Sequence, residues 1–201
     1  EHTALTKTQT ITMSGNDLRH LSNPTDVTRF QNETVVADSG NNRIAFISPS
    51  GVMTALQLDE TPLALCSGDS LYAVTKSKIL QIKDKTITST IDVQDVVDVT
   101  YLSSLYILKK DGVYVNLAGN AVKIFDVDNA KRITAANDGT NVYVLTESEI
   151  VAINRSGQRL LSLASGDFKD AIDFAVDYQG KAFVAYANRI DFVLGEESGS
   201  Y

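Results

Sequence analysis

Short apolar runs that alternate with polar positions recur along this chain, and clusters of Gly, Asn, Asp and Ser separate them. The clearest example is residues 35–51. Val35 to Ala37 is an apolar run, residues 39–42 have the composition of a tight turn, and residues 44–47 are again mostly apolar before Pro49. Two such runs joined by a turn of Gly and Asn predict an antiparallel β-hairpin.

The runs return at a spacing of about 36 residues, which indicates a repeat architecture. Five units emerge, and the first strand of each is short and apolar enough to lie near a crowded central axis. These predicted inner strands are 26–30, 62–65, 96–100, 132–136 and 172–176. The corresponding units are 24–58, 61–91, 95–125, 130–163 and 170–194. The pattern therefore predicts an all-β propeller of five blades in a single domain, residues 1–201.

The outer strands of each unit also alternate in polarity with a period of two, as half-buried strands do. The predicted second strands are 34–37, 70–74, 104–108, 141–145 and 181–185. The third strands are 43–48, 78–83, 112–117, 148–153 and 189–193. Fourth strands are 52–58, 85–91, 120–125 and 158–163. No window of a dozen residues sustains a helical period with caps, so helices are not expected.

The fifth unit lacks a fourth strand, whereas residues 8–13 have fourth-strand character and belong to no unit. Closed propellers often build the last blade from both chain ends, which removes an open sheet edge. We therefore expect residues 8–13 to complete the fifth blade, giving five four-stranded blades, with residues 195–201 as a flexible tail. The alternative is that the chain is part of a six-bladed or larger propeller.

The first unit also resembles a known repeat. Pro24, Val36-Ala37-Asp38, Asn42-Arg43-Ile44 and Pro49-x-Gly51 are similar to the NHL repeat of β-propellers. Asn188-Arg189-Ile190 is similar to the same Asn-Arg-Ile core, while the intervening units depart from it, with Glu149 where Arg would be expected. The resemblance implies a propeller whose usual role is protein–protein interaction.

Composition narrows the function classes. The chain is 43% hydrophobic and 21% charged, which is typical of a soluble globular domain, and no apolar run approaches the length needed to cross a bilayer. A net charge of −7 argues against nucleic acid as the partner, because phosphate binding needs clustered Lys and Arg. Cys66 is the only cysteine, so no internal disulfide is possible. The compartment and the oligomeric state stay open.

Candidate chemistry is sparse. With only His2 and His20, most catalytic schemes and a His-based metal site lack their residues, so we expect no cofactor, no metal and no catalytic residue. The carboxylates of the inner strands are Asp26, Asp95, Asp98, Asp173 and Asp177. Such residues usually bond nearby backbone, but convergence of Asp26, Asp98 and Asp173 in one cavity would favour a carboxylate- or metal-dependent hydrolase or lyase at the central channel.

A binding surface is the remaining possibility. If the loops from second to third strands and from fourth strands to the next unit share one rim, that rim is mixed in charge and suits a protein partner or a small ligand. The candidate binding residues are Asn42, Arg43, Lys78, Lys110, Phe168, Lys169 and Arg189. Phe168 is the candidate aromatic anchor, and the alternative is that its ring packs back against the fifth blade. Asp38 and Arg43 are placed to form an ion pair across their turn. The expected function is that of a noncatalytic interaction module.

Overall fold

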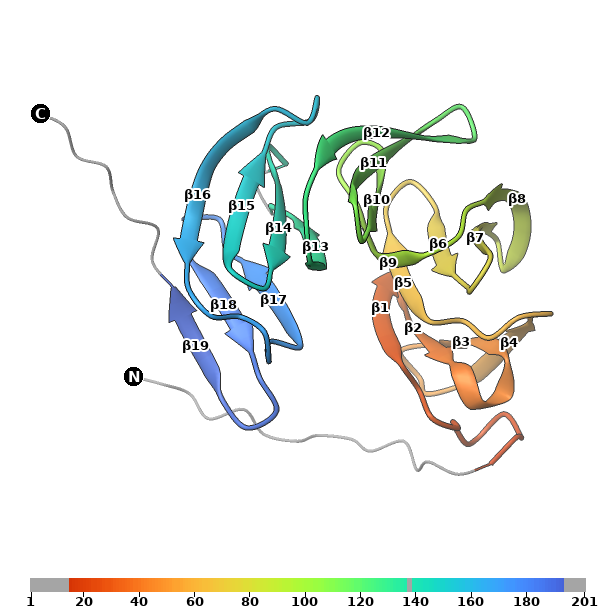
Figure 1. The fold of residues 1–201 in the computed structure, drawn as a ribbon. Coiled ribbons are helices and arrows are strands. Elements are labelled where there is room, and N and C mark those ends of the chain that lie inside the picture. The colour runs from red at the N-terminus through yellow and green to blue at the C-terminus, as the bar shows by residue number, and fades with distance from the viewer. Residues whose placement is uncertain (1–14, 137–138, 194–201) are drawn as a thin grey trace, which may run out of the picture.

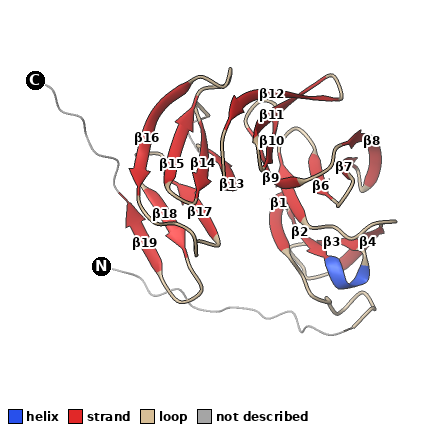
Figure 2. Cartoon of the chain, viewed as in Figure 1, coloured by secondary structure: helices blue, strands red, loops and turns tan. Residues whose placement is uncertain are grey.

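The computed structural model describes residues 15–136 and 139–193, and nearly all of its regular structure is β-strand. Figure 2 shows the strands in red and the single short 3₁₀ turn in blue. None of the described helical structure is long and apolar enough to cross a membrane. The strands form five separate antiparallel sheets, each from consecutive strands of the chain.

Each sheet is one blade, and its strands follow one another outward from the centre (Figure 1). Blade 1 consists of β1 (Asp26–Phe30), β2 (Glu33–Asp38), β3 (Arg43–Ile47) and β4 (Met53–Gln57), with the turn η1 (Ser39–Asn41). Blade 2 consists of β5 (Ala64–Ser67), β6 (Leu71–Val74), β7 (Lys78–Lys83) and β8 (Thr86–Asp92). Blade 3 consists of β9 (Val96–Tyr101), β10 (Leu105–Lys109), β11 (Gly112–Leu117) and β12 (Asn120–Asp126).

The two remaining blades repeat this order. Blade 4 consists of β13 (Ala130–Ala135), β14 (Val142–Thr146), β15 (Glu149–Ile153) and β16 (Arg159–Ser165). Blade 5 consists, within the described residues, of β17 (Asp173–Val176), β18 (Ala182–Ala185) and β19 (Ile190–Val193). The prediction of an all-β, five-bladed propeller is therefore confirmed. The proposed closing strand, 8–13, and the tail, 195–201, lie outside the described residues.

Most strand boundaries differ from the prediction by one or two residues, and one of these differences has a clear chemical cause. The inner strand of blade 2 begins at Ala64 rather than at Pro62. Proline has no N–H to donate to a neighbouring strand, so it stands outside the ladder. Its carbonyl oxygen instead accepts a hydrogen bond of 2.5 Å from the Ser39 hydroxyl of blade 1.

The hydrophobic core lies between the blades. Because side chains alternate between the two faces of a strand, each blade has a forward face toward the next blade and a backward face toward the preceding one. Between blades 4 and 5, the forward face supplies Tyr143, Leu145, Ile150 and Ala152, and the backward face supplies Phe174, Val176, Ala182 and Val184. Equivalent clusters join blades 1 and 2, 2 and 3, and 3 and 4.

The inner strands follow one another around the centre. β1 contacts β5, β5 contacts β9, β9 contacts β13 and β13 contacts β17. Among the described residues, β17 and β1 make no comparable contact. Figure 1 accordingly shows blades 1 and 5 at the two ends of the arc.

Candidate functional site

The loops at one end of the blades form a common rim. In each of blades 1 to 4, the loop between the second and third strands bonds to the segment that leads into the next blade. The backbone bonds include Leu58 N–H to the Asn42 carbonyl (2.9 Å) and Phe168 N–H to the Glu147 carbonyl (2.8 Å). The arrangement on which the expected binding surface depended is therefore present.

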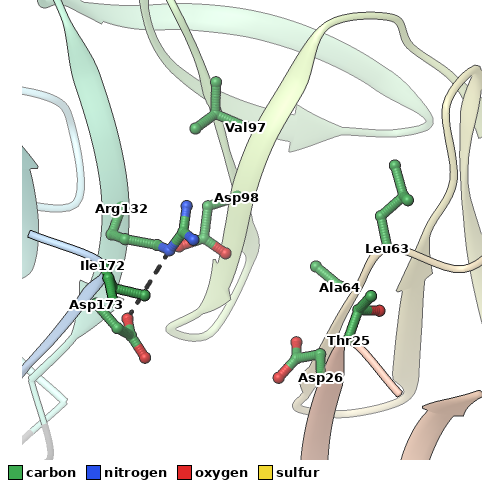
Figure 3. A pocket seen from close by; sticks show the side chains of 9 residues that line it. All are labelled: Thr25, Asp26, Leu63, Ala64, Val97, Asp98, Arg132, Ile172 and Asp173. Carbon is green, nitrogen blue, oxygen red and sulfur yellow. Dashed lines mark ion pairs between the residues drawn. The ribbon is translucent and has the colours of Figure 1, made fainter. Parts of the chain in front are cut away.

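A pocket of about 260 Å³ opens where the inner strands begin, which is the end of the blades that carries this rim. Four charged side chains line it: Asp26, Asp98, Arg132 and Asp173. Figure 3 shows Asp98 and Asp173 on either side of Arg132, with Asp26 across the pocket beside Ala64. The structure thus brings together the three carboxylates whose convergence would favour a hydrolase or lyase.

These residues occupy one repeated register position, which we call the inner position. Its members pair with equivalent residues of the second strands and are Asp26, Ala64, Asp98, Arg132 and Asp173. Asp95 and Asp177 do not line the pocket. Asp177 instead accepts N–H groups of Gln179 and Lys181 in the turn after β17, which is the backbone role expected for such residues.

Two of the carboxylates tie neighbouring blades together. Asp26 Oδ1 accepts the N–H of Val27 (2.7 Å), and its Oδ2 accepts the N–H of Leu65 in blade 2 (2.7 Å). Asp98 links blades 3 and 4 in the same way, since it accepts the N–H of Val99 at 2.8 Å and the N–H of Ile133 in blade 4 at 3.0 Å. Their main interactions are with backbone, so they are structural in the resting protein.

Arg132 is the charged residue of the pocket that sequence reasoning did not single out. Its Nε lies 4.0 Å from Asp173 Oδ1, and its Nη1 donates to the Lys131 carbonyl oxygen. Strand pairing places Arg132 at the same repeat position as Asp26 and Asp98. This shared position is the signal that would have identified it. A permanent positive charge among three carboxylates makes the pocket mixed in charge rather than purely acidic.

The pocket raises the pKa of two of its carboxylic acids, Asp98 and Asp26. Burial raises the pKa of Asp98 to about 6, although the N–H groups of Ile133 and Val99 and the charge of Arg132 act in the opposite direction. Burial also raises the pKa of Asp26, and the nearby charge of Asp173 adds to the increase. An acid that titrates near neutral pH in a pocket is a candidate proton donor.

Metal and thiol chemistry receive no support from the described residues. Within residues 15–136 and 139–193, no three His, Cys, Asp or Glu side chains are arranged to hold a metal ion. Cys66 is buried, and that burial raises its thiol pKa to about 12. Such a thiol stays protonated and is a poor nucleophile.

Arg43 has a structural role. It forms a buried ion pair with Asp38 (Nε to Oδ2, 2.6 Å), as expected from their positions across the turn. Its guanidinium also donates to the carbonyl oxygens of Asn16, Asp17 and His20. It therefore holds residues 15–22, which we call the strap, against blade 1.

Asn42 and Lys78 lie on the rim. Asn42 has a left-handed backbone (φ 49°), and its side-chain oxygen accepts a bond from the Thr61 hydroxyl (2.6 Å). Lys78 Nζ lies 3.5 Å from Glu60, whose pKa is lowered to about 2, mainly by hydrogen bonds from the hydroxyls of Ser77 and Thr75. Both side chains are therefore already engaged with the protein itself.

Lys110 and Lys169 are exposed on the rim, but Phe168 between Asp167 and Lys169 is not. Its ring is 6% exposed and packs between blades 4 and 5. Of the two alternatives for Phe168, the structure shows packing against blade 5 and not an exposed anchor. The Phe168 N–H to Glu147 bond folds the loop back, and this places the ring in the core.

Arg189 is exposed on the loop between β18 and β19. Its Nε lies 3.1 Å from Asp191 Oδ1, and its guanidinium carbon lies 3.8 Å from the centre of the Tyr186 ring. Unlike Arg43, to which it corresponds in sequence, Arg189 is open to solvent. It is thus available to an outside group.

Comparison with known proteins identifies the fold alone. No protein-family model matches this sequence, and no curated protein matches it. Among solved structures, virginiamycin B lyase from Staphylococcus aureus is similar at 13% identity with a TM-score of 0.70. The match covers 86% of this chain and 66% of that one.

Two WD40 propellers are similar to about the same degree. The Pan2 WD40 domain of Neurospora crassa matches at 12% identity with a TM-score of 0.69, over 92% of this chain and 65% of that one. The Doa1 WD40 propeller matches at 9% identity with a TM-score of 0.67, over 86% and 63%. The chain thus spans slightly less than two thirds of the length of each of these three structures. The neighbours include a lyase and WD40 domains, so the likeness establishes a β-propeller and no particular activity.

Proposed function

We propose that this protein is a noncatalytic, NHL-like interaction module that binds a protein partner through the rim and the central pocket it surrounds. The observation that supports this most directly is the bonding between paired loops in four successive blades. A rim that is fastened in this way presents its exposed side chains at fixed positions, which lowers the entropy lost on binding. The sequence resemblance of blade 1 to NHL repeats is consistent with this role.

Lys110 and Lys169 are the rim residues best suited to contact a partner. Both are exposed, and neither side chain makes a hydrogen bond or ion pair within the described residues. Asn42, Arg43 and Lys78 are bound to neighbouring residues of the protein itself. The contact residues therefore form a smaller set than the sequence suggested, while the mixed charge of the rim remains.

The test is a pull-down from the source cells with a charge-reversed rim, Lys110→Glu with Lys169→Glu. The matched control is Lys83→Glu, an exposed lysine at the opposite end of blade 2. The rim variant is expected to lose partners that the wild type and Lys83→Glu both retain, with no change in melting temperature. Retention of all partners by the rim variant would refute the assignment.

A second function is favoured by the pocket itself. Asp98, whose pKa is about 6, lies beside Asp173 and Arg132 in a pocket large enough for a small polar group. In a carboxylate-dependent hydrolase or lyase, Asp98 would be the proton donor. Turnover of a panel of glycosides, esters and lactones that disappears in Asp98→Asn would support this function. Equal rates for the two proteins would rule it out.

A further inference from the structure

The forward face of blade 5 has the composition of a blade–blade interface, but no residue within 15–136 or 139–193 covers it. Its side chains stand in register with those that fill the core in blades 1 to 4. They are Ala175, Phe183, Ala185, Ile190 and Phe192. The rings of Phe183 and Phe192 contact each other edge to face, with centroids 5.3 Å apart.

Matched positions show how unusual this face is. Ile190 corresponds to Ile44, Ile79, Val113 and Ile150, because each of these residues pairs with the member of the second strand that faces the inner position. All four equivalents are completely buried, whereas Ile190 is 61% exposed. Phe192 is 65% exposed, whereas its equivalent Phe46 is 2% exposed. Contiguous exposed apolar residues of this kind mark interaction sites.

Blade 1 is not suited to cover this face. Part of its backward face is already occupied, because Leu21 of the strap joins a buried cluster with Val36, Ala45, Ile47 and Met53. The strap is fixed there by Arg43, by Asp38, which accepts the Ser22 N–H at 2.6 Å, and by the Gly40 N–H bond to the Ser22 carbonyl. A neighbouring blade, whether from this chain or from a second copy, would have to displace Leu21.

The inner position gives an independent argument. Acidic and non-acidic residues alternate there, and each Asp with a following blade bonds one N–H of its own blade and one of the next. Within the described residues, Asp173 Oδ1 accepts the N–H of its own neighbour Phe174 at 2.9 Å and pairs with Arg132, and no described residue bonds its Oδ2. At blade 1 the corresponding N–H, that of Val27, is already bound to Asp26.

We propose that the forward face of blade 5 binds a β-sheet of another protein, packed against it as a sixth blade. The four existing interfaces define the chemistry of this sheet. Its inner strand has an apolar residue whose N–H is free to bond Asp173 Oδ2, and the residue before it is small or basic, as Ala64 and Arg132 are. The sheet also supplies an acceptor for Lys181, whose ammonium lies 4.8 Å from the Phe192 ring centre and 5.4 Å from that of Phe183.

The first measurement tests whether a second copy of this chain occupies the forward face of blade 5. Sedimentation of the full chain at increasing concentration is expected to show a monomer, since blade 1 of a second copy is excluded by Leu21 and Asp26. A concentration-dependent dimer that disappears in Ile190→Lys would overturn the assignment to another protein, because the occupant would then be a second copy.

The second measurement uses a blade of known chemistry as the probe. A second copy of residues 61–93, which carries Ala64 at the inner position, is fused behind the full chain through a flexible linker. Docking is expected to raise the melting temperature of the chain by about 5 °C and to slow hydrogen exchange in β18 and β19. Introducing Ile190→Lys into the chain should abolish both effects.

The matched fusion carries Ala64→Asp in the added copy only. Its melting temperature is expected to rise much less, because the carboxylates of Asp173 and of the introduced Asp then compete for the same N–H, that of Leu65 in the added copy. Equal gains from the two fusions would refute the rule drawn from the inner position, and no gain from either would refute the docking face. Neither result touches the rim, so failure here is distinguishable from failure of the proposed function.

Discussion

The two ends of the propeller arc differ in how their outward faces are covered. At blade 1, the strap places Leu21 over the backward face. It is held by the Arg43 guanidinium, which donates to three strap carbonyl oxygens, and by Asp38, which accepts the Ser22 N–H. At blade 5, the forward face carries Phe183, Ile190 and Phe192 and has no cover among the described residues. Repeat proteins need a polar or covered surface where a stack of repeats ends. One end of this arc therefore has the features of a terminus, whereas the other has the features of an unfinished interface.

The same sequence motif shows the contrast in detail. Arg43 and Arg189 both belong to an Asn-Arg-Ile triplet. Arg43 is buried and pairs with Asp38, whereas Arg189 lies on the surface with Asp191. Burying a charge is costly unless it is paired, so the first arginine is committed to the fold. The second is free to change partners.

The largest expected effect follows from this difference. Replacing Asp38 with Ala leaves the Arg43 guanidinium buried without its counter-charge, which should lower the free energy of unfolding by about 3–5 kcal/mol. Asp191→Ala at the exposed pair should cost no more than about 1 kcal/mol. Urea denaturation of both variants measures the two values, and equal costs would mean that the two ends are held alike.

The next largest effect is expected at the register position shared by Ile150 and Ile190. Ile150→Ala creates a cavity between blades 4 and 5 and should cost about 2–5 kcal/mol. Ile190→Ala, at the same register position one blade later, should stay within about 0.5 kcal/mol because its side chain already contacts water. A cost for Ile190→Ala close to that for Ile150→Ala would show that the blade 5 face is covered in the isolated protein.

A pH effect should report on Asp98, whose carboxylate links blades 3 and 4. Burial raises the folded-state pKa of Asp98 from 3.8 to about 6, so the folded protein binds that proton more tightly than the unfolded chain does. The resulting stability is fully present below about pH 4 and is lost as the pH rises through about 6, by roughly 1–3 kcal/mol in total. The raised pKa of Asp26 acts in the same direction. Asp98→Asn should flatten the stability profile between pH 4 and 6, and an unchanged profile would contradict the assignment.

Features of the fold that depend on residues close together in the sequence could be predicted, whereas those that depend on distant residues could not. The hairpins and the Asp38–Arg43 pair were predictable, because alternation, turn residues and a separation of five positions are local signals. The grip of Arg43 on residues 16–20 was not, since its acceptors are backbone carbonyls that no side-chain pattern records. The sequence left open whether Phe168 is exposed or packed for a similar reason, because one backbone bond decides which way its loop folds.

The candidate site was predictable only in part. The carboxylates were recognisable as residues of inner strands, but their convergence with Arg132 depends on the register between blades, which brings together positions more than thirty residues apart. Alignment of the repeats by strand pairing reveals that register, and it requires the structure. Pairing of residues 8–13 with the edge of β19 stays a prediction.

The smallest expected effect gives the sharpest test of the asymmetry. Val27 is 61% exposed, although its equivalents Leu65, Val99 and Ile133 are buried against the preceding blade. Val27→Ala should therefore change the free energy of unfolding by no more than about 0.5 kcal/mol. Val99→Ala, which removes buried methyl groups at the same position, should cost roughly 1.5–3 kcal/mol. If denaturation shows that Val27→Ala costs as much as Val99→Ala, then blade 1 is covered in solution, and the ring closes on itself.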